Sequence, residues 1–191
     1  MTSDPPDPLI QLAERVATIA ADVGIATAVI GATALAAHNY VRGTADIDLA
    51  TAVDPFLDLS RLRERLTAEG FHTELTLPDA DDSLGGVLRV RARDEDDDPV
   101  EIVNFLNPLR PNHNPGPEAV RMAEPIGVTS PLRCATLHHL IALKLYAGGR
   151  RDQADVVELL RCNPGADRSQ IREVCARYGS ASVLDELLQE V

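Results

Sequence analysis

The sequence predicts an α/β (α+β) fold in which helices flank a mixed β-sheet and a helical bundle forms the C-terminal part. The chain has 191 residues, 45% of them hydrophobic, which is enough for a sizeable core. Between residues 9 and 110, short apolar runs typical of strands alternate with amphipathic helical patterns. Beyond residue 130 the patterns are helical only. Together these observations favour one sheet-containing core followed by helices.

The chain divides into four parts by composition. Residues 1–8 form a tail rich in proline and aspartate that we expect to be disordered. Residues 9–110 form the sheet-containing core, 111–130 a proline-rich connection, and 131–191 the helical C-terminal part. The elements expected in the core are helices at 9–23, 32–38 and 54–69 and strands at 26–30, 46–49, 71–77, 84–93 and 99–106.

The charge balance argues against a simple polyanion-binding protein. The formal net charge is −12, and residues 1–110 carry 20 acidic against 9 basic residues. Three cysteines without metal-ligand spacing are expected to be reduced thiols. Because no signal peptide and no apolar run of membrane-spanning length is found, we expect a cytoplasmic protein without a membrane partner.

The stretch from residue 26 to residue 51 organises the predicted site. Asp46 and Asp48 are two apart in a strand pattern, so both carboxylates project from the same face. Two adjacent carboxylates repel each other unless a cation lies between them, and hard oxygen ligands suit Mg²⁺. The alternative interpretation is a solvated strand end.

A glycine turn precedes this pair of aspartates. Gly31 interrupts an apolar strand pattern and opens a helix, where free backbone N–H groups suit a phosphate. Gly31 can also be an ordinary turn residue. A phosphate-binding turn beside a paired-aspartate metal site is the arrangement that metal-assisted phosphoryl or nucleotidyl transfer requires.

These residues resemble a known superfamily. Gly31-Ala32 and Arg42-Gly-Thr44-Ala-Asp46-Ile-Asp48-Leu are similar to the Gly-Gly/Ser…Asp-x-Asp signature of polymerase-β-type nucleotidyltransferases. Within it, the chain looks closest to the AbiEii-like nucleotidyltransferases, toxins of toxin–antitoxin pairs. The resemblance implies that Gly31, Ala32, Thr33 and Arg42 bind the nucleotide. Ala32 departs from the usual Gly or Ser, which keeps a backbone N–H but loses a hydroxyl unless Thr33 replaces it.

A third carboxylate is expected on the strand at 99–106. Glu101 is an isolated acid in the apolar run Val-Glu-Ile-Val, on the face opposite Val100 and Ile102. In the superfamily, a third metal-binding carboxylate comes from this strand, and the resemblance gives that role to Glu101. The acids of the loop 94–98 are the rival candidates.

Arg89, Arg91 and Arg93 alternate along the preceding strand. They form either a cationic stripe for a phosphate backbone or a solvated face that offsets nearby acids.

The only lysine, Lys144, lies on the apolar stripe of a helix expected from Ser130-Pro131 to Ala147. Its head group either reaches solvent or meets a phosphate or carboxylate in a cleft. Residues 143–160 resemble the second signature of the AbiEii-like group, which implies that Lys144 contacts the nucleotide phosphates and that Asp155, with Asp152, completes the site. The structural alternative is a helix-capping box with Asp152 as the N-cap.

The resemblance implies a Mg²⁺-dependent nucleotidyltransferase with a nucleoside triphosphate as substrate and a two-metal site formed by Asp46, Asp48 and Glu101. Catalytic roles fall on these three carboxylates and on Lys144. The acceptor is an RNA such as tRNA, a protein or a small molecule, and a cognate antitoxin is an expected partner. The alternative is a catalytically silent module of the same fold that binds a nucleotide or a partner protein.

Overall fold

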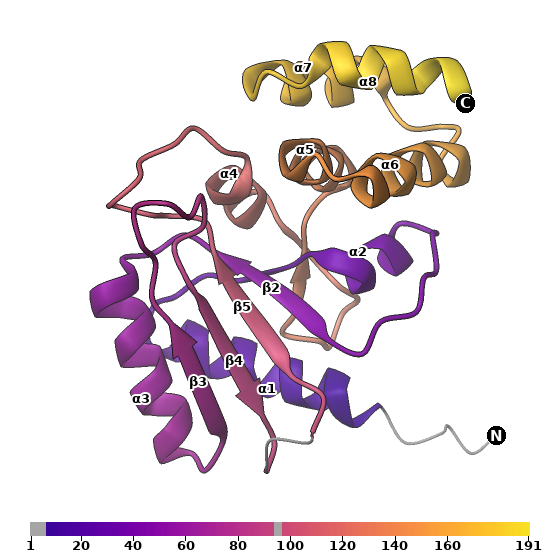
Figure 1. Ribbon diagram of the computed structural model, residues 1–191. Coiled ribbons are helices and arrows are strands. Elements are labelled where there is room, and N and C mark those ends of the chain that lie inside the picture. Colours follow the sequence, from indigo (N-terminus) through magenta and orange to yellow (C-terminus); the bar gives the residue numbers. More distant parts are fainter. Residues whose placement is uncertain (1–6, 94–96) are drawn as a thin grey trace, which may run out of the picture.

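The computed structural model describes residues 7–93 and 97–191, and it consists of a mixed sheet with helices on both sides (Figure 1). The disordered tail expected at 1–8 and the acidic loop at 94–98 lie largely outside the described residues. No helix in the described part of the chain is both long enough and apolar enough to cross a membrane.

Seven strands form one sheet in the order β3-β4-β5-β2-β1-β7-β6. The central strands β2 and β5 run parallel, and β3, β4 and β5 form an antiparallel meander. The strands are β1 (Ala28–Val29), β2 (Ile47–Thr51), β3 (His72–Thr76), β4 (Val87–Arg91), β5 (Val100–Asn104), β6 (Glu124–Pro125) and β7 (Arg133–Cys134).

Helices cover the sheet in layers. α1 and α3 lie on one side, whereas α2 and α4 lie between the sheet and a stack of α5 to α8 on the other side (Figure 1). The helices are α1 (Pro8–Asp22), α2 (Gly31–Ala37), α3 (Ser60–Ala68), α4 (Gly116–Arg121), α5 (Leu137–Ala147), α6 (Arg150–Cys162), α7 (Arg168–Arg177) and α8 (Ala181–Leu187). A π-helical turn (Pro55–Leu59) precedes α3, and a 3₁₀ turn (Leu188–Glu190) follows α8.

The α/β fold class and the main core elements are confirmed. Strands β2 and β5 alternate as expected, because Ile47, Leu49, Val100 and Ile102 are at most 3% exposed while the intervening side chains face the opposite side. α2 ends just before Asn39, which has a positive φ of 66°, as the sequence predicts for a helix stop.

The proline-rich connection expected at 111–130 contains α4 and β6. One expectation about the second half of the chain is wrong. The helix expected from Ser130-Pro131 begins only at Leu137, because Arg133–Cys134 forms a strand that pairs with β1 and β6. Sheet pairing therefore overrides the local Ser-Pro start signal.

Candidate active site

Asp48 lies at the centre of the candidate site. In the parallel register of β2 and β5 it stands directly beside Glu101, and Asp46 is two residues away on its own chain. Burial, followed by the charges of Asp46 and Glu101, raises the pKa of Asp48 from 3.8 to about 6, while Lys144 and Arg42 oppose the rise. The three predicted carboxylates are thus close enough to repel one another.

Gly31 is fixed by the same carboxylate. Its φ is 61°, which favours glycine, and a Cβ atom at this position would lie only 1.9 Å from Asp48 Oδ2. The Ile30 N–H also donates a hydrogen bond of 2.9 Å to the Asp48 carbonyl oxygen. The glycine turn and the strand carboxylate, separate motifs in the sequence, therefore form one contact in the fold.

The other two carboxylates have partners of their own. The Thr44 hydroxyl donates to Asp46 Oδ1, and Arg89 Nε donates a 2.7 Å hydrogen bond to Glu101 Oε1. Among the described residues, no group of three or more His, Cys, Asp or Glu side chains is arranged to hold a metal ion. Asp46 and Asp48 nevertheless offer the hard, anionic oxygen ligands that Mg²⁺ prefers, and a bound cation would offset both the burial and the neighbouring negative charges that raise the pKa of Asp48.

The head group of Lys144 meets two carboxylates. Its Nζ donates a 2.8 Å hydrogen bond to Asp152 Oδ1 and lies 2.9 Å from Asp155 Oδ2, outside hydrogen-bonding direction. The Lys144 side chain is 13% exposed and that of Asp155 only 2%. Of the two interpretations of this lysine, the structure supports the one in which it meets carboxylates.

Arg42 joins the same cluster from the loop between α2 and β2. Its Nε lies 3.9 Å from Asp155 Oδ1, and its Nε and Nη1 are buried without a hydrogen-bond partner. Buried donors without partners are costly, so these two are suited to an anionic ligand.

The capping interpretation of Asp152 needs correction. α6 begins at Arg150 with Gly149 as its N-cap, so Asp152 lies in the first turn and Asp155 beyond it. Asp155 is therefore a buried ion-pair partner of Lys144 rather than a member of a capping box.

The remaining predicted residues have mixed outcomes. Ala32 is 4% exposed in the first turn of α2, next to the partly exposed Thr33. Arg89 is bound to Glu101, with Glu74 3.9 Å away, and Arg91 also lies 3.9 Å from Glu74. These contacts favour the interpretation that Arg89 and Arg91 offset nearby acids.

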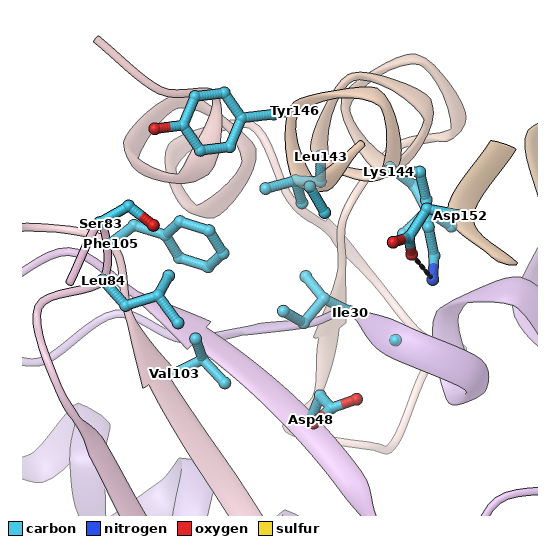
Figure 2. Close-up of a pocket in the computed structure, with 13 residues that line it drawn as sticks. Ile30, Asp48, Ser83, Leu84, Val103, Phe105, Leu143, Lys144, Tyr146 and Asp152 are labelled. Atoms are coloured by element: carbon cyan, nitrogen blue, oxygen red, sulfur yellow. Dashed lines mark hydrogen bonds and ion pairs between the residues drawn. The ribbon is translucent and has the colours of Figure 1, made fainter. Parts of the chain in front are cut away.

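A cavity of about 460 Å³ adjoins part of the site (Figure 2). Of the site residues, Gly31, Asp48, Lys144 and Asp152 line it. The apolar lining residues are not predicted from the sequence, although Val103 shares the strand face of Glu101 and could have been found by that alternation. The other lining residues are Ile30, Ser83, Leu84, Phe105, Leu140, Leu143, Tyr146 and Ala147.

Comparison with solved structures identifies the fold. The antibiotic-resistance factor ANT(2'')-Ia in solution superposes with a TM-score of 0.58 at 17% identity, covering 95% of this chain and 96% of that chain. The chain has the nucleotidyltransferase fold. The crystal structure of ANT(2'')-Ia in complex with adenylyl-2''-tobramycin gives 0.52 at 14% identity, covering 90% and 97% of the two chains.

An antigenic nucleotidyltransferase-like protein from Paracoccidioides brasiliensis gives a TM-score of 0.53 at 16% identity, covering 96% of this chain and 93% of that one. No protein-family model and no curated protein matches the sequence. The expected superfamily fold is thus confirmed, and the AbiEii-like assignment stays a prediction.

Proposed function

We propose that this protein transfers a nucleotidyl group from a nucleoside triphosphate to an acceptor, with Mg²⁺ as the cofactor. One observation carries the proposal: the carboxylate of Asp48 lies against Gly31, beside Glu101, and in the same cavity as Lys144. This arrangement combines metal ligands, a phosphate-binding turn and a cation in one cleft. The fold shared with ANT(2'')-Ia, whose structure holds an adenylylated antibiotic, supports the same chemistry.

In the reaction, the acceptor oxygen forms a bond to the α-phosphorus of the triphosphate. The bond from that phosphorus to the α–β bridging oxygen breaks, and pyrophosphate leaves with the electron pair. Glu101 is suited to receive the proton of the acceptor hydroxyl, because it lies beside Asp48, which lines the cavity. Mg²⁺ would neutralise the triphosphate charge.

Asp46 and Asp48 would hold the metal, and Glu101 would join them after exchanging its hydrogen bond with Arg89. Lys144 and Arg42 would bind the phosphates, and the Gly31–Thr33 backbone would face them. Asp155 would keep both cations in place because it lies near each of them.

Two refinements rest on the sequence resemblance. In an AbiEii-like toxin, the acceptor would be an RNA such as tRNA and the partner a cognate antitoxin. A catalytically silent module is the second candidate, and it is favoured by the Arg89–Glu101 hydrogen bond and by the alanine at position 32.

The test is the double substitution Asp46→Asn and Asp48→Asn. We expect it to abolish Mg²⁺-dependent binding of nucleoside triphosphates, measured by calorimetry, and to leave the fold intact because neither side chain belongs to the core. Equal Mg²⁺–nucleotide affinity in the double variant and the wild type would contradict the metal assignment. A wild type that binds Mg²⁺–nucleotide but shows no pyrophosphate release with any acceptor would support the silent module.

A further inference from the structure

The cavity has two chemically different halves. All of Asp48, Lys144 and Asp152 line it, and Figure 2 shows Asp48 at the bottom of the view and Lys144 with Asp152 at the right. Figure 2 shows the side chains of Ile30, Leu84, Val103, Phe105 and Leu143 pointing toward a common space away from Lys144. Nucleotidyl transfer, as proposed, uses the charged half only.

Strand β5 connects the two halves. Glu101 and Val103 share the face opposite the buried Val100 and Ile102, so they are two strand positions, or about 6.6 Å, apart. In the register with β2, Asp48 lies beside Glu101 and Ala50 lies beside Val103. Asp48, Val103 and Phe105 all line the cavity, so a molecule with a hydroxyl near Asp48 has its next atoms against Val103 and then Phe105.

Residues outside the cavity hold the walls of its apolar half in place. Phe105 packs on Gly116, where a Cβ atom would lie 2.1 Å from Phe105 Cγ, and Asn114 Nδ2 donates to the Phe105 carbonyl oxygen at 2.9 Å.

The segment 79–84, which carries Ser83 and Leu84 into the cavity, is held in a similar way. Asn107 Nδ2 donates to the carbonyl oxygens of Asp79 and Asp82 at 2.8 and 2.9 Å, and Asn112 Nδ2 donates to that of Ser83 at 2.9 Å. A preorganised wall lowers the entropic cost of binding a ligand.

The charges near the cavity limit the class of ligand for this half. Lys144 is neutralised by Asp152 and Asp155, and Arg89 on the adjacent strand is bound to Glu101. No free cation of the described lining is left over for a polyanionic acceptor. A polycationic acceptor would have to place its ammonium groups against leucine, valine and phenylalanine, which is costly.

We propose that the apolar half of the cavity binds the body of the acceptor, and that the acceptor is a small, uncharged molecule with a hydroxyl group and an apolar or aromatic body. This inference rests on the proposed function for the identity of the reacting group. The hydroxyl lies at the acidic end, near Asp48 and its strand neighbour Glu101, and the body extends along Val103 toward Phe105.

The test compares ligands on matched variants by calorimetry. The probes are 4-phenyl-1-butanol, tobramycin, Mg²⁺ with a non-hydrolysable α,β-methylene ATP, and Mg²⁺ with tripolyphosphate. Val103→Thr and Leu84→Asn make the apolar wall polar, and Val128→Thr and Leu109→Asn make the same changes at side chains that are 102% and 52% exposed. We expect the two wall variants to weaken 4-phenyl-1-butanol binding about tenfold and the two controls to leave it unchanged.

The outcomes separate this inference from the proposed function. Affinity for both Mg²⁺–phosphate ligands should stay within about twofold in the wall variants, because those ligands bind in the charged half. If the wall variants weaken the ATP analogue but not tripolyphosphate, the apolar half binds the nucleobase and the inference is overturned. Tighter binding of tobramycin than of 4-phenyl-1-butanol by the wild type would also overturn it. Failure of the ATP analogue to bind the wild type, with aryl-alcohol binding retained, would instead refute nucleotidyl transfer.

Discussion

The two charged clusters beside the cavity differ in how their charges are balanced. On the sheet, Arg89 pairs with Glu101, and burial together with the charges of Asp46 and Glu101 raises the pKa of Asp48 to about 6. On the helices, Asp152 and Asp155 face Lys144, with Arg42 nearby. The helix cluster is neutral by itself, whereas the sheet cluster carries excess negative charge. The difference suggests that the sheet cluster is suited to a metal ion and that the helix cluster needs an exchange of partners to bind phosphate.

Removing the cation from the neutral helix cluster should cause the largest change in the free energy of unfolding. Lys144→Met leaves Asp155 charged, 2% exposed and without its closest partner, so we expect a loss of about 3 kcal/mol in the free energy of unfolding at pH 7. The sequence alone gives the opposite expectation, namely unharmed stability, because it names Asp152 and Asp155 as site residues but does not show that they pair with Lys144. Urea unfolding measures the difference.

The control for this variant is a double-mutant cycle with Asp155→Asn. Removing the second charge should recover part of the loss, with a coupling of at least about 1 kcal/mol. A fully stable Lys144→Met variant would show that the ion pair contributes nothing. In that case the fall in triphosphate affinity could be measured on the single variant directly.

Removing one negative charge from the sheet cluster should cause the second largest change in the free energy of unfolding, and this change should be stabilising. The folded pKa of Asp48 is about 6 and its ordinary value is 3.8, so between these values the native state binds more protons than the unfolded state. Stability therefore falls as pH rises through this window and stays lower above it. Asp48→Asn removes the penalty, and its advantage over wild type should grow from near zero below pH 4 to at most about 3 kcal/mol at pH 7.

Thermal or urea unfolding at pH 4, 5, 6 and 7 provides the measurement. Millimolar Mg²⁺ should narrow the gap at pH 7, since only the wild type gains a bound cation. A gap that does not change with pH would show that Asp48 has an ordinary pKa.

The sequence predicted the sheet half of the site better than the helix half. Period-two alternation is a local signal, and it placed Asp48 and Glu101 on the strand faces opposite Ile47, Leu49, Val100 and Ile102, where β2 and β5 bring them side by side. The partners of Lys144 come from the next helix, and no spacing rule connects a lysine in α5 with a buried aspartate in α6. The late start of α5 was missed for a similar reason, because β7 exists only through pairing with β1 and β6.

The glycine turn at the start of α2 differs from both charged clusters. Ala32 has a backbone role in the proposed function, and its side chain is buried in the fold. Ala32→Gly should cost about 1–2 kcal/mol of stability: about 1 from helix propensity and up to 0.8 from the lost buried methyl group. Ala36→Gly, at an exposed position of the same helix, should cost the propensity part only. Chemical unfolding of both variants separates the two contributions.

Nucleotide affinity decides the functional role of Ala32. It should be unchanged in Ala32→Gly, because the backbone N–H is retained. A fall in affinity without any larger loss of stability than in Ala36→Gly would show that the methyl group, rather than the backbone, contacts the ligand.

The smallest expected change in stability comes from breaking the ion pair between Arg89 and Glu101. The side chains of Arg89 and Glu101 are 34% and 22% exposed, so Arg89→Leu should cost only about 0.5–1 kcal/mol of stability.

The same substitution tests whether Glu101 binds Mg²⁺. Arg89 competes with Mg²⁺ for the Glu101 carboxylate, and removing it should lower the Mg²⁺ concentration at half-saturation by about two- to fivefold, the same energy expressed as affinity. Arg91→Leu is the matched control, since Arg91 lies on the same strand face and approaches Glu74 instead. Isothermal titration with Mg²⁺ and the ATP analogue measures both variants, and an unchanged midpoint in Arg89→Leu would exclude Glu101 from the metal site while leaving Asp46 and Asp48 as its ligands.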